Sequence, residues 1–355
     1  MPDMKGVKLM DEFKNVREIY EWQLDKDRRL FSANHEEILS GRTTDIYFVR
    51  TKELLNYLQS DDVEVTAEIF ASREGVMAGT EEVIGLIKDK DDIEVWSLKE
   101  GENFGEKEVI MRLKGPYTQL AVYETPLLGI LASSTGWATA AADCREAAGE
   151  NITLICFGAR HIHPSSAPVM ERSALVGGFD GCSCLLGAKL KGLQPSGTVP
   201  HAVFLIIGDT VEVAKAYNEI MPEGDAKVIL VDTFKDEVEE SIRVARELEK
   251  DLYGVRLDTP SERGGVTPGL VKEVRAKLDQ EGFNYVRILA SGGINPDKIY
   301  ELKKAGVNAF GVGSFIAAAR PIDMTMDIKE LGDKPIAKRG RIPGLTPTNR
   351  LSKIK

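Results

Sequence analysis

The sequence has few cysteines, few histidines and no excess of basic residues. Its four cysteines, Cys144, Cys156, Cys182 and Cys184, include no CxxC pair, so neither a structural zinc site nor a secreted disulfide framework is expected. We expect buried, reduced thiols instead. Lys and Arg number 46 against 56 Asp and Glu, a formal net charge of −10. This balance argues against nucleic acid as a main partner, because such binders usually carry a basic surface.

Long hydrophobic runs are also missing. No stretch approaches ~18 uninterrupted apolar residues, the length that would span a membrane, and the first residues, MPDMKGVKLMDEFKN, contain no apolar signal-peptide region. We therefore expect no membrane partner and a cytoplasmic protein. The 355 residues are 43% hydrophobic and 29% charged, which suits a barrel together with a smaller domain.

The second half of the chain alternates short apolar runs with helical patterns. The apolar runs are residues 152–157, 227–233, 253–259, 285–291 and 309–314. Strands alternating with helices predict a parallel sheet with helices outside it. We expect an α/β fold, an irregular (β/α) barrel of six to seven parallel strands. Residues 201–207, HAVFLII, are compatible with a strand or with the start of a helix.

The remaining segments predict three parts. Residues 1–115 contain amphipathic and alternating patterns, typical of an α+β N-terminal domain. In that part VEVTAEIF, residues 63–70, alternates as a half-buried strand does. Residues 116–322 form the predicted catalytic barrel and open with a long, alanine-rich helix. Residues 323–355 form an extension that we expect to pack on the N-terminal domain.

Two glycine turns lie one α/β unit apart near the end of the predicted barrel. They are LASGGI, residues 289–294, and FGVGS, residues 310–314. Glycines at consecutive strand ends let backbone N–H groups approach an anion, and the last two such loops of a barrel commonly bind phosphate. The pair predicts a phosphorylated substrate.

Polar side chains at other strand ends would face the same edge of the sheet. Arg160 and Arg256 are candidates for binding a carboxylate or phosphate, because a guanidinium group is planar and bidentate. Asp232 and Asp258 could bind a metal or ribose hydroxyls. His201 is compatible with a nucleophile, a general base or a packed structural histidine.

Taken together, these segments resemble the nicotinate phosphoribosyltransferase family. The matching motifs occur in the family's order: TDIY (44–47), ETPLL (124–128), FGARH (157–161), GGFDGCS (177–183), SGTVPHA (196–202), VRLDT (255–259), ASGGI (290–294) and FGVGS (310–314). The resemblance implies a type II phosphoribosyltransferase fold. It also implies transfer of phosphoribose from phosphoribosyl pyrophosphate (PRPP) to nicotinate, giving nicotinate mononucleotide and pyrophosphate.

The resemblance also implies roles for individual residues. The 5′-phosphate would be held by Ser291, Gly292, Gly293, Gly313 and Ser314. Nicotinate and pyrophosphate would be bound by Arg160, Arg256, Phe157 stacked on the pyridine ring, and Thr198. Tyr47 would cover the ring from a neighbouring subunit, so a homo-oligomer with its active site at the subunit interface is expected. Asp258 would contact ribose hydroxyls or Mg²⁺. His201 would be phosphorylated by ATP to drive the reaction.

The chain departs from the family pattern at three places. His161 follows Arg160 where many members have a second arginine, and Pro200 precedes His201 where many have alanine. No cysteine follows Cys184, so the zinc knuckle of some relatives is not expected. Three other functions remain open: a decarboxylating quinolinate phosphoribosyltransferase, a flavin-binding barrel oxidoreductase and a catalytically silent phosphate-ligand binder.

Overall fold

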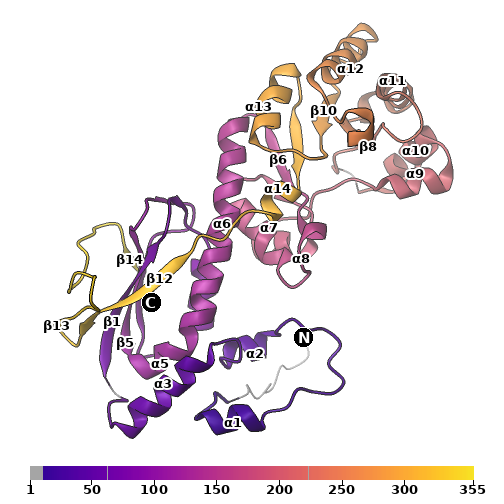
Figure 1. Ribbon diagram of the computed structural model, residues 1–355. Coiled ribbons are helices and arrows are strands. Elements are labelled where there is room, and N and C mark those ends of the chain that lie inside the picture. Colours follow the sequence, from indigo (N-terminus) through magenta and orange to yellow (C-terminus); the bar gives the residue numbers. More distant parts are fainter. Residues whose placement is uncertain (1–10, 62, 223) are drawn as a thin grey trace. The chain divides into compact units, whose positions relative to one another are not determined.

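The computed structural model describes residues 11–61, 63–222 and 224–355. The chain forms two compact units, one made of Met1–Gly136 with Arg320–Lys355 and the other of Trp137–Ala319 (Figure 1). The first ten residues of the predicted N-terminal domain lie outside the described residues. Residues 116–136, assigned above to the barrel, belong to the first unit.

The first unit is built on a six-stranded sheet of order β13-β12-β1-β5-β3-β14. These strands are β1 (Glu64–Ala71), β3 (Glu94–Ser97), β5 (Val109–Pro116), β12 (Met324–Leu331), β13 (Lys334–Pro335) and β14 (Ser352–Lys353). A small second sheet pairs β2 (Gly75–Val76) with β4 (Asn103–Phe104). The helices of this unit are α1 (Val16–Glu21), α2 (His35–Leu39), α3 (Ile46–Tyr57), α4 (Thr80–Leu86), α5 (Tyr117–Leu120) and the first half of α6 (Glu124–Ala148).

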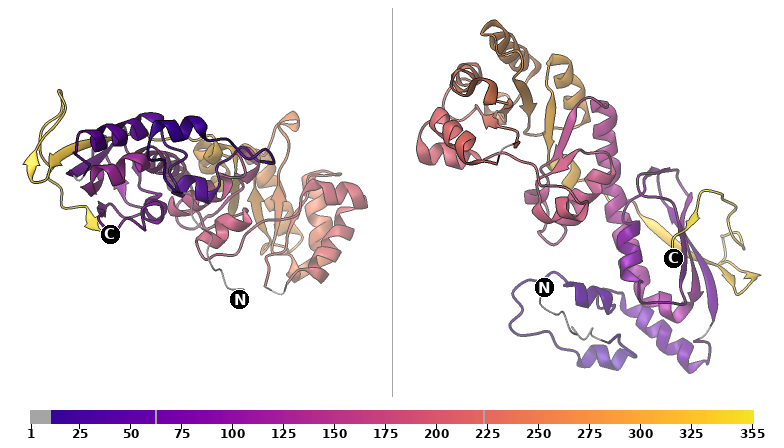
Figure 2. Two further views of the ribbon diagram at one scale, coloured as in Figure 1. Left: turned by 90° about the horizontal axis from the view of Figure 1, so that it is seen from below. Right: turned by 180° about the vertical axis from the view of Figure 1, so that it is seen from behind.

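The C-terminal segment completes this sheet. Strand β12 pairs antiparallel with β1, from Val65 opposite Leu331 to Ala71 opposite Met324, and β14 pairs with β3. The yellow C-terminal strand lies beside the purple strands in both views of Figure 2.

Strand β1 was predicted to be half-buried, and this prediction was wrong. Six of its eight residues are buried, and these six lie on both faces of the strand. The C-terminal segment lies against the polar face of the strand. There Glu68 accepts hydrogen bonds from the Arg112 side chain and from the Thr346 backbone N–H. The alternating pattern did not reveal the cover, because a buried carboxylate with hydrogen-bond partners is as polar in sequence as an exposed one.

The second unit contains the parallel sheet, in the order β7-β6-β11-β10-β9-β8. Its strands are β6 (Thr153–Cys156), β7 (Gly181–Cys182), β8 (Val228–Leu230), β9 (Gly254–Leu257), β10 (Arg287–Ala290) and β11 (Ala309–Val312). They form a curled half-barrel, which confirms the predicted irregular barrel of six to seven parallel strands beside an α+β domain.

Helices cover the outside of this half-barrel (Figure 1). The helices α10 (Thr210–Ile220), α11 (Glu237–Leu248), α12 (Pro268–Gln280) and α13 (Pro296–Ala305) pack one against the next around it. The others are α7 (Ala167–Val176), α8 (Leu185–Leu190), α9 (His201–Ile207) and α14 (Ser314–Ala317). Residues 201–207 are therefore helical, with left-handed Gly208 ending α9. Among the described residues, no helix is long and apolar enough to cross a membrane.

Candidate active site

A cavity of about 460 Å³ opens at the carboxyl ends of the parallel strands. All of its lining residues belong to the second unit. They include all the site residues predicted for the barrel except Asp232: Phe157, Arg160, Thr198, His201, Arg256, Asp258, Ser291, Gly292, Gly293, Gly313 and Ser314. These residues lie at or directly after the ends of four of the six strands, or at the start of α9 and in the loop before it. The topology therefore brings together motifs that are up to 157 positions apart in the chain.

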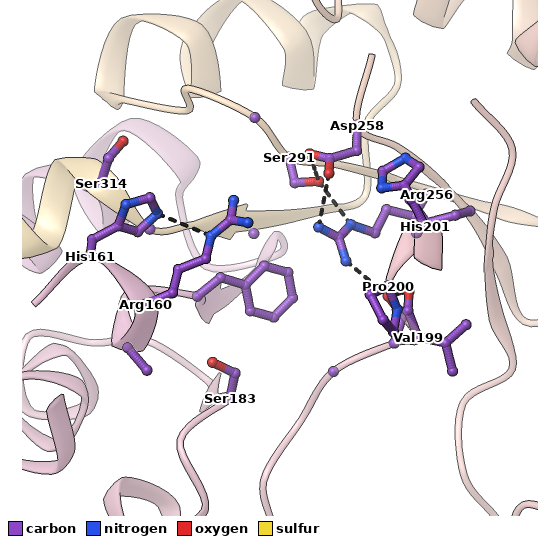
Figure 3. Close-up of a pocket in the computed structure, with 18 of the residues that line it drawn as sticks. Arg160, His161, Ser183, Val199, Pro200, His201, Arg256, Asp258, Ser291 and Ser314 are labelled. Atoms are coloured by element: carbon purple, nitrogen blue, oxygen red, sulfur yellow. Dashed lines mark hydrogen bonds and ion pairs between the residues drawn. The ribbon is translucent and has the colours of Figure 1, made fainter. Parts of the chain in front are cut away.

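Arg256 lies on one side of the cavity, where three hydrogen bonds hold its guanidinium group (Figure 3). Its Nε donates to Ser291 Oγ at 2.8 Å, Nη1 to Thr198 Oγ1 at 2.9 Å and Nη2 to Asp258 Oδ2 at 3.4 Å. Ser291 Oγ in turn donates to Asp258 Oδ1 at 2.8 Å. Burial lowers the pKa of Arg256. A guanidinium has five N–H donors, and two of those on Arg256 stay available for an anion.

Arg160 extends towards Arg256 from the opposite side of the cavity (Figure 3). Its Nε lies 3.4 Å from His161 Nε2. In the part of the chain that the structure describes, no carboxylate pairs with Arg160. Two guanidinium groups facing one space without full neutralisation repel each other, and an anion bound between them removes that repulsion.

Phe157, the aromatic residue that lines the cavity, lies against the second glycine turn. The Phe157 ring lies beside the Arg256 guanidinium, with 5.0 Å between the Arg256 Cζ atom and the ring centroid. A Cβ atom at Gly311 would lie 2.3 Å from this ring, and one at Gly313 would lie 2.6 Å from the Phe157 carbonyl oxygen. These two glycines therefore make room for Phe157, a role that the sequence alone did not suggest.

The first glycine turn presents backbone to the cavity. Gly292 and Gly293 have φ values of +89° and +63°, in the left-handed region that glycine adopts without strain. Ser291 precedes them and is tied to Asp258 and Arg256. The geometry suits close approach of a phosphate oxygen to the turn.

His201 begins α9 and lies 3.1 Å, through Nε2, from Asp232 Oδ2. Asp232 follows β8, and burial raises the pKa of its carboxyl group, while the contact with His201 opposes that shift. Its Oδ1 is buried without a hydrogen-bond partner among the described residues. A carboxylate that orients a histidine ring is the usual arrangement where a histidine exchanges a proton or a phosphoryl group.

Besides Asp232, which contacts His201 without lining the cavity, Tyr47 is the predicted site residue that lies outside it. It lies at the start of α3 in the first unit, is 53% exposed, and lines a different cavity together with Asp45, Glu124 and Thr125. Its proposed part in catalysis concerns an assembly of chains and stays a prediction.

Two residues at or behind the cavity were not singled out from the sequence. Ser183 lines the cavity and belongs to the glycine-rich segment GGFDGCS, where serine is a common turn residue. Glu171 lies behind the cavity on α7. Its signal was the one carboxylate of the helical stretch APVMERSALV, and a carboxylate on a buried helix requires hydrogen-bond partners.

Comparison with protein families gives two adjoining matches. The N-terminal domain model of quinolinate phosphoribosyl transferase matches residues 45–135, and the C-terminal domain model matches residues 137–327. The crystal structure of nicotinate-nucleotide pyrophosphorylase from Pyrococcus furiosus is 40% identical and has a TM-score of 0.83. The match covers 90% of this chain and 82% of the Pyrococcus furiosus chain. Human nicotinic acid phosphoribosyltransferase shares the fold at 18% identity and a TM-score of 0.65, over 85% of this chain and 77% of its own.

Two curated relatives carry different names. Nicotinate phosphoribosyltransferase of Bacillus subtilis is 32% identical over 63% of this chain, and the match spans 46% of that relative, about half its length. A probable carboxylating nicotinate-nucleotide pyrophosphorylase of Methanothermobacter thermautotrophicus is 23% identical over 75% of this chain and 89% of its own. The two family matches together extend over most of the sequence. The chain therefore belongs to the quinolinate phosphoribosyl transferase family, with the type II phosphoribosyltransferase fold.

Proposed function

We propose that this chain transfers the phosphoribosyl group of PRPP to the ring nitrogen of a pyridine carboxylic acid, giving nicotinate mononucleotide and pyrophosphate for NAD biosynthesis. The observation that carries the proposal is the pair of facing arginines, Arg160 and Arg256, in one cavity with the two glycine turns. That cavity offers separate places for a phosphate and for a second anion beside an aromatic ring.

The proposed chemistry needs little from an acid or a base. The pyridine nitrogen carries a free lone pair at neutral pH and forms the bond to the anomeric carbon, while the bond from that carbon to pyrophosphate breaks. Positive charge develops on the ribose ring, and negative charge develops on the leaving group. Catalysis then consists of positioning and of stabilising the leaving charge, for which Arg160 and Arg256 are suited.

The residues fit the Mg²⁺ expected with PRPP. Asp258 reaches the cavity, and Asp232 has a buried carboxylate oxygen without a partner among the described residues. Within the described ranges, no three His, Cys, Asp or Glu side chains gather as a metal cluster. This fits an ion held through substrate oxygens and one or two carboxylates, as Mg²⁺ commonly is. When bound, Mg²⁺ would neutralise charge on the pyrophosphate, and Asp258 and Asp232 would hold it.

The comparisons favour quinolinate as the acceptor. Both family models are described as quinolinate phosphoribosyl transferase domains, and the Pyrococcus furiosus structure is named a nicotinate-nucleotide pyrophosphorylase. With quinolinate, the ring carboxylate beside the nitrogen would leave as carbon dioxide. Its bonding electron pair would stay on the ring carbon, which then takes a proton.

Nicotinate is the second candidate, and the charge of the cavity favours it. Among the described residues, Arg160 and Arg256 are the only arginines or lysines that line the cavity, and Arg256 already donates to three side chains. Quinolinate carries one more carboxylate than nicotinate, and holding that second carboxylate would require a cation beyond those that bind the other anionic groups. The Bacillus subtilis relative is also named a nicotinate phosphoribosyltransferase.

One assay tests these alternatives together. Purified protein is incubated with PRPP and Mg²⁺ and with either acid, with and without ATP, and nicotinate mononucleotide, pyrophosphate and carbon dioxide are measured. Product from quinolinate with equimolar carbon dioxide supports the first acceptor, and product from nicotinate alone supports the second. Stimulation by ATP would support phosphorylation of His201, whose Nδ1 is not used in the contact with Asp232. Lack of product with both acids would contradict the proposed function.

A further inference from the structure

Glu171 is a fully buried carboxylate on α7 that the proposed chemistry does not use. Its Oε1 accepts hydrogen bonds from the Ala159 backbone N–H at 2.9 Å and from Ser183 Oγ at 3.1 Å. Its Oε2 accepts one from the Cys184 backbone N–H at 2.5 Å. In the part of the chain that the structure describes, no Lys, Arg or His side chain forms an ion pair with it.

A buried carboxylate without a cation is costly to keep, since desolvation opposes its charge. If α7 only had to fill the core, an apolar side chain at this position would stabilise the fold more than a carboxylate does. In the contacts with Ala159, Ser183 and Cys184, the carboxylate oxygens of Glu171 are the acceptors. The positions of these donors therefore give the best indication of what Glu171 does.

The donors come from two loops that both reach the cavity. Ala159 belongs to the turn after β6 and directly precedes Arg160, while Ser183 and Cys184 follow the neighbouring strand β7. Ala159, Arg160 and Ser183 all line the cavity. One side chain thus bridges two adjacent strand ends from behind.

Arg160 has little else to hold it. Its side chain is exposed, and its one hydrogen bond to a described residue is the 3.4 Å contact with the neighbouring His161. The direction of its guanidinium therefore depends on the backbone of the Ala159–His161 turn, whose first N–H is held by Glu171. By contrast, three hydrogen bonds of its own fix Arg256.

Helix α8 covers the Glu171 contact closely. A Cβ atom at Gly187 would lie 3.2 Å from Glu171 Cβ and 3.2 Å from the Pro168 carbonyl oxygen. This close approach excludes water from the carboxylate, which strengthens its hydrogen bonds relative to those of an exposed group. The two loops are therefore held by contacts that solvent does not compete for.

We infer that Glu171 is a positioning residue, which aims Arg160 and Ser183 into the cavity and so sets the affinity of the site for the anion bound by Arg160. The inference rests on the proposed function for the identity of that anion, a pyridine carboxylate or the pyrophosphate of PRPP. The link between Glu171 and the two loops is independent of the proposed function.

The link itself is tested by hydrogen–deuterium exchange of the full chain, which needs no activity. In Glu171→Gln one oxygen becomes an amide N–H that faces a donor, so at least one loop loses its acceptor, and Glu171→Ala releases both. We expect at least tenfold faster exchange in peptides containing Ala159 and Cys184. The matched control is Glu240→Gln, which alters a fully buried carboxylate on α11 that pairs with Arg243. Unchanged exchange in both loops of both Glu171 variants would overturn the inference.

The consequence for binding is tested by a double-mutant cycle in the same assay. Glu171→Gln should raise KM for the substrate whose anion Arg160 binds by about tenfold, the size of one lost hydrogen bond to a charged group, while kcat changes less than threefold. In the Arg160→Ala background the same change should have no further effect on KM. An equal increase in both backgrounds, or a normal KM in a variant that merely melts earlier, would contradict the role. If the unaltered protein makes no nicotinate mononucleotide, the proposed function fails, and the exchange experiment still decides about Glu171.

Discussion

At the scale of single residues, the site depends on how Arg256 is held. Its side chain donates to Thr198, Ser291 and Asp258 and lies beside Phe157. The motif VRLDT placed Arg256 and Asp258 at a strand end, and a parallel sheet brings strand ends together. That Ser291 bridges them could not be predicted from the sequence, because serine occurs in many turns and its partner lies 33 positions away.

The first prediction concerns the shape of this cation. Arg256→Lys keeps the charge but loses the planar fork that reaches three side chains and an anion at once. We expect kcat/KM for nicotinate mononucleotide formation to fall by about 10²–10³, as when one transition-state donor is removed. Arg243→Lys on α11, in an ion pair away from the cavity lining, serves as the control and should leave kcat/KM within about twofold.

At the scale of elements, two glycine turns were predicted to bind phosphate. The structure shows that the second turn also makes space for an aromatic side chain. Gly311 and Gly313 make space for Phe157, because β11 and β6 are paired neighbours. The sequence indicated both strands, but it could not show that they are adjacent, since they are separated by more than 150 residues. Helix α10 was not among the predicted segments, and its N-cap residue Asp209 directly follows Gly208, which ends α9.

A second prediction tests the space beside β11. Gly311→Ala would put a methyl group 2.3 Å from the Phe157 ring and should destabilise the protein by about 1–3 kcal/mol through overpacking. Adding Phe157→Leu should restore much of the free energy of unfolding without restoring affinity for the acid. Urea unfolding and KM measure the two effects. Gly85→Ala in α4, where a Cβ meets nothing within 4 Å, is the control, and an equal destabilisation there would contradict the account.

A third prediction concerns Glu124, the first residue of α6. Burial, and then the nearby Asp327 carboxylate, raise its pKa to about 7. The folded state then binds a proton more tightly than the unfolded state, whose value is about 4.3. The free energy of unfolding therefore falls as pH rises between these values and stays lower above pH 7.

Glu124→Gln removes this dependence. The stability of the variant relative to the unaltered protein should rise by about 1–2 kcal/mol between pH 5 and pH 8, after allowance for solvent screening. Urea unfolding at both pH values measures it. Glu146→Gln, at an exposed position of the same helix, should show no such change. Equal pH dependence in both variants would refute the assignment.

At the scale of the whole molecule, the two compact units carry different parts of the predicted site. Eleven of the predicted site residues line one cavity in the second unit, while Tyr47 lies in the first. The alternation of strands and helices was enough to predict the half-barrel. The assembly that would bring Tyr47 of one copy to the cavity of another is a property of several chains, so one sequence pattern predicts it only through the family resemblance.

A fourth prediction tests that assembly. If Tyr47 acts from a neighbouring copy, Tyr47→Ala and Arg256→Ala are each impaired, but mixed oligomers contain some sites with neither change. Co-expression or subunit exchange should then restore up to about a quarter of the unaltered activity in a dimer, as statistical mixing of two subunit types requires. A mixture no more active than the separate variants would show that Tyr47 does not complete a neighbour's site.

The central claim is that this chain makes nicotinate mononucleotide from PRPP and a pyridine carboxylic acid. The most direct measurement is mass-spectrometric detection of that product, with pyrophosphate release, from purified protein, Mg²⁺, PRPP and either quinolinate or nicotinate. We predict PRPP-dependent product with one of the two acids, and its loss in Arg256→Ala. Absence of nicotinate mononucleotide with both acids at saturating PRPP would contradict the claim.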